Sequence, residues 1–304
     1  MAAVVDAHAP AFSPETFLAK YVARLGEVVD MPSPGDLKPT LEVLTLMMDA
    51  QTRSVPFENI DVALRKTISM EPEDVTRKML DQKRGGYCFE QNTLLKLALE
   101  LIGFTVTPLL CRVRWGKRPD ENTAFTHMCL KVDVEGEGGS YLADVGFAGT
   151  NSIEPISLNA TGPLELSDGT WWTEERDGYV FLSMKDREEE ETVGRDLYCW
   201  STTGCMYPDL LQANHWSCTK VPGARFTGQL FVAITSGQEK LHIMNNTFVR
   251  RVMGGSKETT AIESTGQLEE LLRTHFRLDL GVSDPETLAA MSKGDGVARY
   301  LQPK

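Results

Sequence analysis

The sequence predicts an α+β protein with more than one domain. Residues 13–84 carry apolar side chains at the three- and four-residue spacing that is typical of helices. After Gly103 the pattern changes to short apolar and β-branched runs separated by turn residues, which is typical of strands. A third region, from about Pro208, combines both patterns. The length of 304 residues is enough for two or three domains.

Three helices are predicted in the first region. The first begins at Ser13, because Pro14 and Glu15 are typical of a helix start, and it ends at Gly26. The second begins at Thr40 and the third in the acidic segment 71–74. We expect their apolar faces to be buried. Those faces carry Phe17, Tyr21 and Leu25, then Leu41, Leu44, Met47 and Met48, then Val75, Met79 and Leu80.

A fourth helix is predicted over residues 92–103, just after Cys88 and the glycine pair Gly85-Gly86. The free N–H groups and the positive dipole end of a helix N-terminus favour a thiolate, so we expect a lowered pKa for Cys88. The two glycines leave room for a sharp turn or for a ligand close to the backbone. A buried, unreactive helix cysteine is the alternative.

Short strands are predicted after this helix, at residues 104–113, 128–134 and 141–145. The same pattern continues around Trp171 and at residues 179–182 and 198–200, as in a sheet or small barrel. The charged stretch 185–191 is predicted to be a solvated loop.

The third region is predicted to contain strands at residues 230–234 and 248–249. A helix is expected at residues 265–276 and a last short helix from Asp284.

Composition excludes several classes of protein. The net charge of −12 argues against a general nucleic-acid binder. No apolar run approaches the roughly 18 residues of a membrane span. The first twelve residues lack the basic region and apolar core of a secretory signal, so a cytoplasmic protein is expected.

The six cysteines are scattered and form no Cys-x-x-Cys pair, so neither a zinc site nor a disulfide framework is indicated. We interpret the five other than Cys88 as structural. They are Cys111, Cys129, Cys199, Cys205 and Cys218.

A cysteine nucleophile needs a base, and His127 is the best candidate because it stands at the entry of a buried strand. Its alternative is a satisfied histidine at a sheet margin. The other histidines lie in the N-terminal segment (His8), in a predicted loop (His215), and in a strand and a helix of the third region (His242 and His275).

Asp144 could orient this base, since an aspartate inside an apolar strand needs a partner. A symmetrical hairpin would place Asp144 opposite Lys131, roughly 13 Å along the strand from His127. Spacing alone therefore leaves two readings open. Asp144 pairs with Lys131, or a bulge or bend brings it to His127.

Several segments together resemble the arylamine N-acetyltransferases. The match consists of Arg84-Gly85-Gly86-Tyr87-Cys88-Phe89-Glu90-Gln91-Asn92, then Thr126-His127-Met128, then Ala143-Asp144-Val145-Gly146-Phe147. Upstream, Val55-Pro56-Phe57-Glu58-Asn59-Ile60-Asp61 and Tyr21-Val22-Ala23-Arg24-Leu25-Gly26 are similar to two further family segments. The resemblance covers residues 17–150 well. Beyond them it rests on two short segments, 225–227 and 247–251.

This resemblance implies a three-part fold with a cysteine-protease-like core. A helical bundle would span residues 1–86, a β-barrel with the Cys88 helix at its junction residues 87–207, and an α/β lid residues 208–304. It also implies a triad of Cys88, His127 and Asp144. The triad would carry an acetyl group from acetyl-CoA, or another acyl-CoA, to the nitrogen of an arylamine, arylhydrazine or N-hydroxyarylamine. The reaction would be ping-pong and would use no metal.

Substrate contacts are also implied. Phe57 and Phe125 would give the flat apolar wall that an aromatic amine needs, with core packing as the alternative. The resemblance puts CoA contacts at Thr227, Gly149 and Thr150. The basic pair Lys117-Arg118 is most simply part of a solvated loop.

The same triad chemistry serves cysteine amidohydrolases and transglutaminases, which is the alternative function. A non-catalytic protein that keeps the fold is a second alternative. The expected partners are a small-molecule amine and an acyl-CoA, with no nucleic acid and no membrane. The sequence predicts no oligomeric state.

Overall fold

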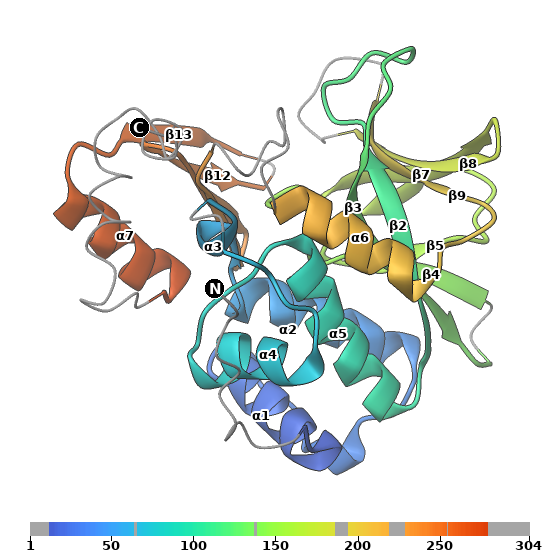
Figure 1. Ribbon diagram of the computed structural model, residues 1–304, viewed down its shortest axis with the longest axis horizontal. Helices are drawn as coiled ribbons and strands as arrows, with labels where there is room; N and C mark the ends of the chain where they lie inside the picture. The colour runs from blue at the N-terminus through green and yellow to red at the C-terminus, as the bar shows by residue number, and fades with distance from the viewer. Residues whose placement is uncertain are drawn as a thin grey trace, which may run out of the picture.

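The computed structural model describes residues 12–63, 66–136, 139–185, 194–218, 229–253 and 255–278. These residues form a group of helices, an eight-stranded sheet and a five-stranded sheet (Figure 1). The predicted α+β class is confirmed. Within the described ranges, no helix has the length and apolar character needed to cross a bilayer.

The helical group follows the predicted starts. Ser13 Oγ accepts a hydrogen bond from Thr16 N at the start of the first helix, and Thr40 Oγ1 accepts one from Val43 N at the start of the second. The predicted apolar faces of these two helices are largely buried. The elements are α1 (Pro14–Gly26), a 3₁₀ turn (Pro34–Asp36), α2 (Leu41–Ser54), α3 (Ile60–Ala63), α4 (Pro72–Thr76) with a π-helical continuation η2 (Arg77–Asp81), and α5 (Cys88–Ile102).

Helix α5 begins at Cys88, four residues earlier than its apolar spacing predicts, and it ends at Gly103, whose φ is +109°. This positive φ is the left-handed conformation in which glycine most often closes a helix. The helix packs between the other helices and strands β2 and β3. Cys88 is therefore set at a helix N-terminus that meets the sheet.

The eight-stranded sheet has the order β5-β4-β3-β2-β9-β8-β7-β6, with antiparallel neighbours, and it curls into a nearly closed barrel (Figure 1). Its inner side is filled by buried side chains that include Cys111, Cys129, Trp171 and Tyr198. The strands are β2 (Thr105–Val113), β3 (Phe125–Val134), β4 (Gly139–Ala143), β5 (Ile156–Ser157), β6 (Leu164–Leu166), β7 (Gly169–Arg176), β8 (Tyr179–Lys185) and β9 (Arg195–Ser201). Most of the predicted solvated loop 185–191 lies outside the described residues.

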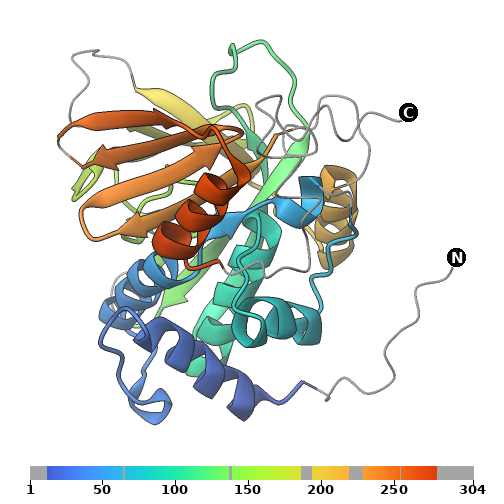
Figure 2. The ribbon, with the colours of Figure 1, turned by 90° about the vertical axis from the view of Figure 1, so that its left-hand side faces the viewer.

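The five-stranded sheet has the order β1-β10-β11-β12-β13, and helix α7 covers one of its faces (Figure 2). Its first strand, β1 (Phe57–Glu58), comes from the helical region and pairs with β10. The other elements are β10 (Phe231–Ser236), β11 (Glu239–Met244), β12 (Thr247–Val252), β13 (Lys257–Ala261) and α7 (Thr265–Phe276). The predicted helix from Asp284 lies outside the described residues.

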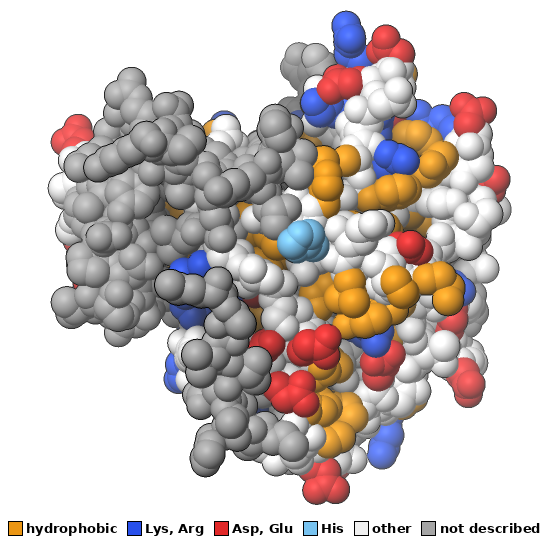
Figure 3. Space-filling model, viewed as in Figure 1, with side chains coloured by type: hydrophobic (Ala, Val, Ile, Leu, Met, Phe, Trp, Pro, Cys, Tyr) orange, Lys and Arg blue, Asp and Glu red, His pale blue; other side chains and the backbone are white. Residues whose placement is uncertain are grey.

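Helix α6 (Tyr207–Cys218) corrects one prediction, because His215 lies in this helix and not in a loop. Its inner side buries Leu210, Ala213, Asn214 and Ser217, at the spacing of a helix. Hydrophobic side chains gather on the face of the molecule that contains α6 (Figure 3). The exposed hydrophobic side chains of α6 are Tyr207, Leu211 and Trp216, and Met206, just before the helix, is exposed as well.

Candidate active site

Cys88 is the first residue of α5, and only 2% of it is exposed. Its Sγ lies 3.6 Å from the carbonyl oxygen of Thr126, the residue before His127. The chain before it is fixed by a parallel bridge between Gly86 and Phe57 and by a hydrogen bond from Glu58 N to Gly86 O. The start of α5 and the start of β3 are thus held together at the thiol.

The two glycines before Cys88 make room for atoms of the chain itself. A Cβ on Gly85 would lie 2.1 Å from Pro56 O, and a Cβ on Gly86 would lie 2.7 Å from Glu90 Cβ. These distances are far below van der Waals contact, so only glycine fits without a shift of backbone or of a buried side chain. The sequence suggested that the two glycines leave room for a ligand or for a sharp turn. In the structure, they instead allow close packing against atoms of the chain itself.

His127 and Asp144 are joined by a 2.7 Å contact between Nε2 and Oδ2, and both are buried. The β3–β4 register pairs Leu130 with Ala143, so the next residue, Asp144, comes two positions closer to His127 than a symmetrical hairpin would place it. At that register Asp144 and His127 are diagonal neighbours on one face, which side chains can span. The alternative pairing is not made, because Lys131 lies 3.1 Å from Asp133 instead.

Asn92 ties the three segments of this site together. Its Nδ2 donates to Asp144 Oδ1 at 3.0 Å, to Met128 O at 2.7 Å and to Cys88 O at 3.3 Å. Its Oδ1 accepts from Val145 N at 3.2 Å. Sequence reasoning missed this role. The available signal was a polar side chain one helical turn after Cys88, on a side of α5 that is buried.

The Asp144 carboxylate stays ionised although it is buried. Burial raises its pKa, but His127, Asn92 and the N–H of Gly146, 2.8 Å from Oδ1, together hold the pKa below its usual value. Because the folded pKa is lowered, Asp144 contributes stability above its unfolded pKa of about 3.9, and this contribution is lost as the pH falls through the folded pKa.

The pKa of the Cys88 thiol is shifted in the opposite direction, because it is raised. Burial raises the pKa of Cys88 and the Asp144 charge adds to the rise, while backbone N–H groups, including that of Phe89, oppose it. The expectation of a lowered pKa from the helix N-terminus alone is therefore wrong for this closed site. A buried thiol next to a carboxylate needs a base to ionise, and the imidazole bonded to Asp144 is suited to that task.

Aromatic rings surround the imidazole. Phe147 packs edge-on to the His127 ring at 5.1 Å, and Tyr198 lies at 4.8 Å between ring centroids. Phe147 was part of the matched segment but was not predicted as a site residue. Its contact depends on the turn after Asp144.

The two phenylalanines predicted for the amine pocket lie in different parts of the structure. Phe57 is buried in β1 and meets Phe231 of β10 at 5.9 Å between ring centroids. Phe125 lies on the opposite side of β3 from His127, because a bulge at Thr126 pairs Cys111 with His127 and Arg112 with Phe125.

On the side of β3 that faces away from His127, Phe125 lines a cavity of about 520 Å³ between α6 and strands β2 and β3. The structure thus does not bring it to the imidazole.

Two of the three residues predicted to contact CoA, Gly149 and Thr150, lie in the described part of the chain. Gly149 has a φ of +77°, and a Cβ there would lie 3.6 Å from Ala233 Cβ in β10. Thr150 N donates to Phe147 O at 3.0 Å. This turn therefore links the His127 surroundings to the five-stranded sheet. Thr227 lies outside the described residues. Lys117 pairs with Glu121, and Arg118 is exposed.

A row of cations crosses that sheet on the face away from α7. In the strand register, Lys240 of β11 lies directly opposite Arg251 of β12, and Arg251 lies opposite Lys257 of β13. Opposed residues in antiparallel strands share one face, and like charges placed there destabilise the pairing. Lys240 Nζ is 3.0 Å from Asp168 Oδ2 and 3.3 Å from Asn151 O, so this face is turned toward the chain that follows Asp144.

His242 lies on the same face, between the cations and Phe231. Its ring stacks on Phe231 at 5.6 Å between centroids. Burial, with Lys257 and Arg251 adding to it, lowers the pKa of His242 to about 4. The face is thus cationic at one end and aromatic at the other.

Gly146 is a position where a small change should disturb the site. A Cβ there would lie 2.7 Å from Asn92 Nδ2 and 2.8 Å from Cys88 Cα. We expect Gly146→Ala to destabilise the fold by about 1–3 kcal/mol, because these buried atoms must move apart. Thermal unfolding checks this, with Gly162→Ala, where no atom lies within 4 Å, as the control. Equal unfolding temperatures for the two variants would contradict it.

The chain matches the N-acetyltransferase family model over residues 40–284. It is 33% identical to an arylamine N-acetyltransferase of Mycolicibacterium smegmatis, over 87% of this chain and 92% of the relative. It is 31% identical to the arylamine N-acetyltransferase / N-hydroxyarylamine O-acetyltransferase of Salmonella typhimurium, over 84% of this chain and 91% of that one.

Solved structures agree with these relatives. The arylamine N-acetyltransferase of M. smegmatis superposes with a TM-score of 0.82 at 29% identity, covering 90% of this chain and 97% of that one. That of Mycobacterium marinum in complex with CoA gives 0.78 at 26% identity, covering 93% and 97%.

Proposed function

This chain belongs to the arylamine N-acetyltransferase family, and from that premise we propose that it transfers an acetyl group from acetyl-CoA to the nitrogen of arylamines, arylhydrazines or N-hydroxyarylamines through a thioester on Cys88. The observation that carries the proposal is the buried contact between His127 and Asp144 beside a cysteine at a helix N-terminus.

The first half-reaction makes the acyl-enzyme. Because His127 Nε2 is bonded to Asp144, Nδ1 is the nitrogen that takes the proton of Cys88. The thiolate attacks the carbonyl carbon of acetyl-CoA. The bond to the CoA sulfur then breaks, and CoA leaves as a thiol with the proton from the imidazolium. We propose that backbone N–H groups at the start of α5 stabilise the oxyanion.

The second half-reaction releases the acetyl group. An arylamine is mostly neutral near pH 7, so its nitrogen attacks the thioester and its proton passes to His127 as the tetrahedral intermediate collapses. Cys88 leaves as the thiolate and the N-acetylated amine departs. Asp144 fixes the imidazole tautomer and stabilises its charged form in both steps.

For the amine, we propose that aromatic rings beside the imidazole and beside the chain that precedes Cys88 supply the flat wall. Phe147 and Tyr198 contact His127, and Phe57 lies beside Gly86, two residues before Cys88. A pocket role for Phe125 stays a prediction that depends on the separate cavity next to α6.

For the donor, we propose that the cation row Lys240, Arg251 and Lys257 attracts the phosphates of CoA, with Gly149 and Thr150 beside it. The chain is acidic overall, so phosphate binding needs a local concentration of positive charge.

The double variant Arg251→Gln/Lys257→Gln should raise KM for acetyl-CoA about tenfold at low ionic strength and leave kcat nearly unchanged. Added salt should reduce the difference, because it screens exposed charges. Arg250→Gln is the matched control, since Arg250 lies on the opposite face of β12 and pairs with Glu239. An unchanged KM in the double variant would rule out the row as a donor site.

The proposed reaction order is tested by giving the protein acetyl-CoA without an amine. We expect about one equivalent of free CoA per protein by chromatography, followed by acetanilide when aniline is added. CoA that appears only when aniline is present would contradict the ping-pong order. Steady release of acetate and CoA without any amine would favour a hydrolase.

A further inference from the structure

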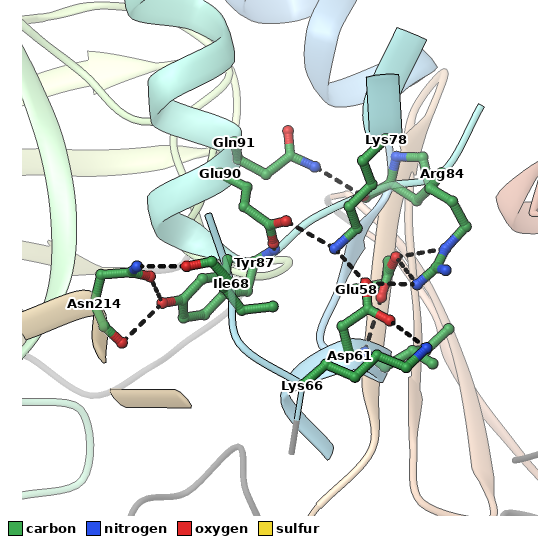
Figure 4. A network of polar contacts seen from close by, with 12 residues as sticks. Glu58, Asp61, Lys66, Ile68, Lys78, Arg84, Tyr87, Glu90, Gln91 and Asn214 are labelled. Carbon is green, nitrogen blue, oxygen red and sulfur yellow. Dashed lines mark hydrogen bonds and ion pairs between the residues drawn. The ribbon is translucent and has the colours of Figure 1, made fainter. Parts of the chain in front are cut away.

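A buried network of charged side chains connects Glu90, in the first turn of α5, to η2, α3 and β1 (Figure 4). Lys78 Nζ is 2.7 Å from Glu90 Oε1 and 2.8 Å from Asp61 Oδ2. Arg84 donates from Nε and Nη2 to Glu58 Oε1, at 2.9 and 2.6 Å. None of these five side chains is more than 18% exposed.

Glu90 connects this network to the nucleophile segment. It is the third residue of α5, and its Oε2 accepts a hydrogen bond from Tyr87 N at 3.0 Å. Ser, Thr, Asp and Asn are the usual residues before a helix, because their short side chains accept such bonds. Tyr87 has no such group near the backbone, and its hydroxyl instead meets Asn214 of α6. Glu90 therefore supplies the acceptor at the start of α5.

Close packing fixes where Glu90 can lie. Its Cβ and Oε2 occupy the space that a side chain on Gly86 would need, at 2.7 and 3.0 Å from the position of that Cβ. Glu90 therefore packs directly against the backbone two residues before Cys88. Its charge is consequently a fixed part of the thiol's surroundings.

That charge creates a problem for catalysis. A carboxylate in the first turn of a helix opposes the formation of a thiolate in the same turn. Burial raises the pKa of Glu90 above its usual value, and the ammonium of Lys78, the main opposing influence, offsets part of this rise. Burial lowers the pKa of Lys78, but Glu90, Glu58 and Asp61 outweigh this effect and keep it charged.

We propose that Glu90 and Lys78 are positioning residues for Cys88. Glu90 fixes the backbone that enters α5, and Lys78 neutralises its carboxylate so that the carboxylate does not oppose the thiolate. The inference rests on the proposed function, in which Cys88 carries the acetyl group.

The other carboxylates near Glu90 have cationic partners besides Lys78. Glu58 is bonded to Arg84, and Asp61 is shared among Lys78, Arg84 and Lys66. Cys218 of α6 is a neighbouring titratable group, and burial raises the pKa of its thiol. Among these groups, Lys78 alone bridges Glu90 to a second carboxylate.

Three variants test the pair. Glu90→Gln keeps an acceptor for Tyr87 N without the charge. Lys78→Met keeps the hydrocarbon stem without the ammonium. The double variant removes both charges. Cys88 alkylation by iodoacetamide is followed against pH by peptide mass spectrometry, together with the single-turnover rate of Cys88 acetylation.

The midpoint of Cys88 alkylation should move in opposite directions in the two single variants. We expect it to fall in Glu90→Gln and to rise in Lys78→Met, each by about one pH unit. Acetylation in Lys78→Met should slow about tenfold near neutral pH. The double variant should recover most of this loss, because no unpaired carboxylate remains. Loss of packing alone would make the double variant worse than either single one.

Lys96→Met is the matched control. Lys96 pairs with Glu100 at 2.7 Å near the other end of the same helix, and its loss should leave the midpoint unchanged. Identical midpoints in all variants, or a double variant that acetylates Cys88 more slowly than either single variant, would overturn the inference. If Lys78→Met does not fold, a midpoint in Glu90→Gln that fails to fall overturns it equally. Failure of the unsubstituted protein to acetylate Cys88 would instead overturn the proposed function.

Discussion

Replacing Cys88 with alanine is expected to remove acetyl transfer altogether, with a loss on the order of 10⁴-fold or more in kcat/KM. The proposed mechanism has no other atom that can hold the acetyl group between the two substrates. The remaining groups could still bind acetyl-CoA and an amine, but direct attack by a weakly nucleophilic arylamine would lack the reactive thioester. Amide formation from aniline and acetyl-CoA measures the effect.

The control for this variant is Cys205→Ala. Cys205 is half-buried beside Pro108 O and lines the cavity next to α6, away from the His127–Asp144 pair. Its replacement should leave kcat/KM within about twofold. A Cys88→Ala protein that folds and still acetylates aniline at a tenth or more of the original rate would refute the acyl-cysteine intermediate.

Asp144→Asn should produce the second-largest loss, about 10³- to 10⁴-fold in kcat, with little change in fold. In the native site Oδ1 accepts from Asn92 Nδ2 and Gly146 N, while Oδ2 faces His127 Nε2. An asparagine cannot satisfy both sides. If its oxygen accepts from Asn92 and Gly146, its NH₂ points at Nε2 and forces the wrong tautomer. The reversed orientation sets donors against donors.

Single-turnover acetylation of Cys88 measures this loss directly, and circular dichroism checks the fold. Asp133→Asn is the control, because Asp133 is a surface partner of Lys131 on the same strand as His127. A loss of less than tenfold in Asp144→Asn would show that His127 does not depend on this carboxylate.

The sequence predicted the helices whose starts and ends are set by neighbouring residues. The hydroxyls of Ser13 and Thr40 mark the starts of α1 and α2, and Gly103 marks the end of α5, since caps and left-handed ends depend on neighbouring residues alone. Strand β1 was not predicted, because its two residues become a strand only through pairing with β10, far away in the chain. Helix α6 was missed because Asn214 and Ser217 stand at inward positions.

The site was predicted as a set of residues but not as a geometry. A symmetrical hairpin left Asp144 too far from His127, and the actual register differs by two residues. The bulge at Thr126, which turns Phe125 away from the imidazole, has no signal in the local sequence. The pKa of Cys88 also depends on burial by segments distant in the chain, which a helix start alone does not reveal.

The acyl-cysteine mechanism is tested most directly by the intact mass of the protein after incubation with acetyl-CoA, followed by peptide mapping. We expect a mass increase of one acetyl group, located on Cys88 and lost when aniline is added. No adduct, or an acetyl group on a different cysteine that aniline does not remove, would contradict it.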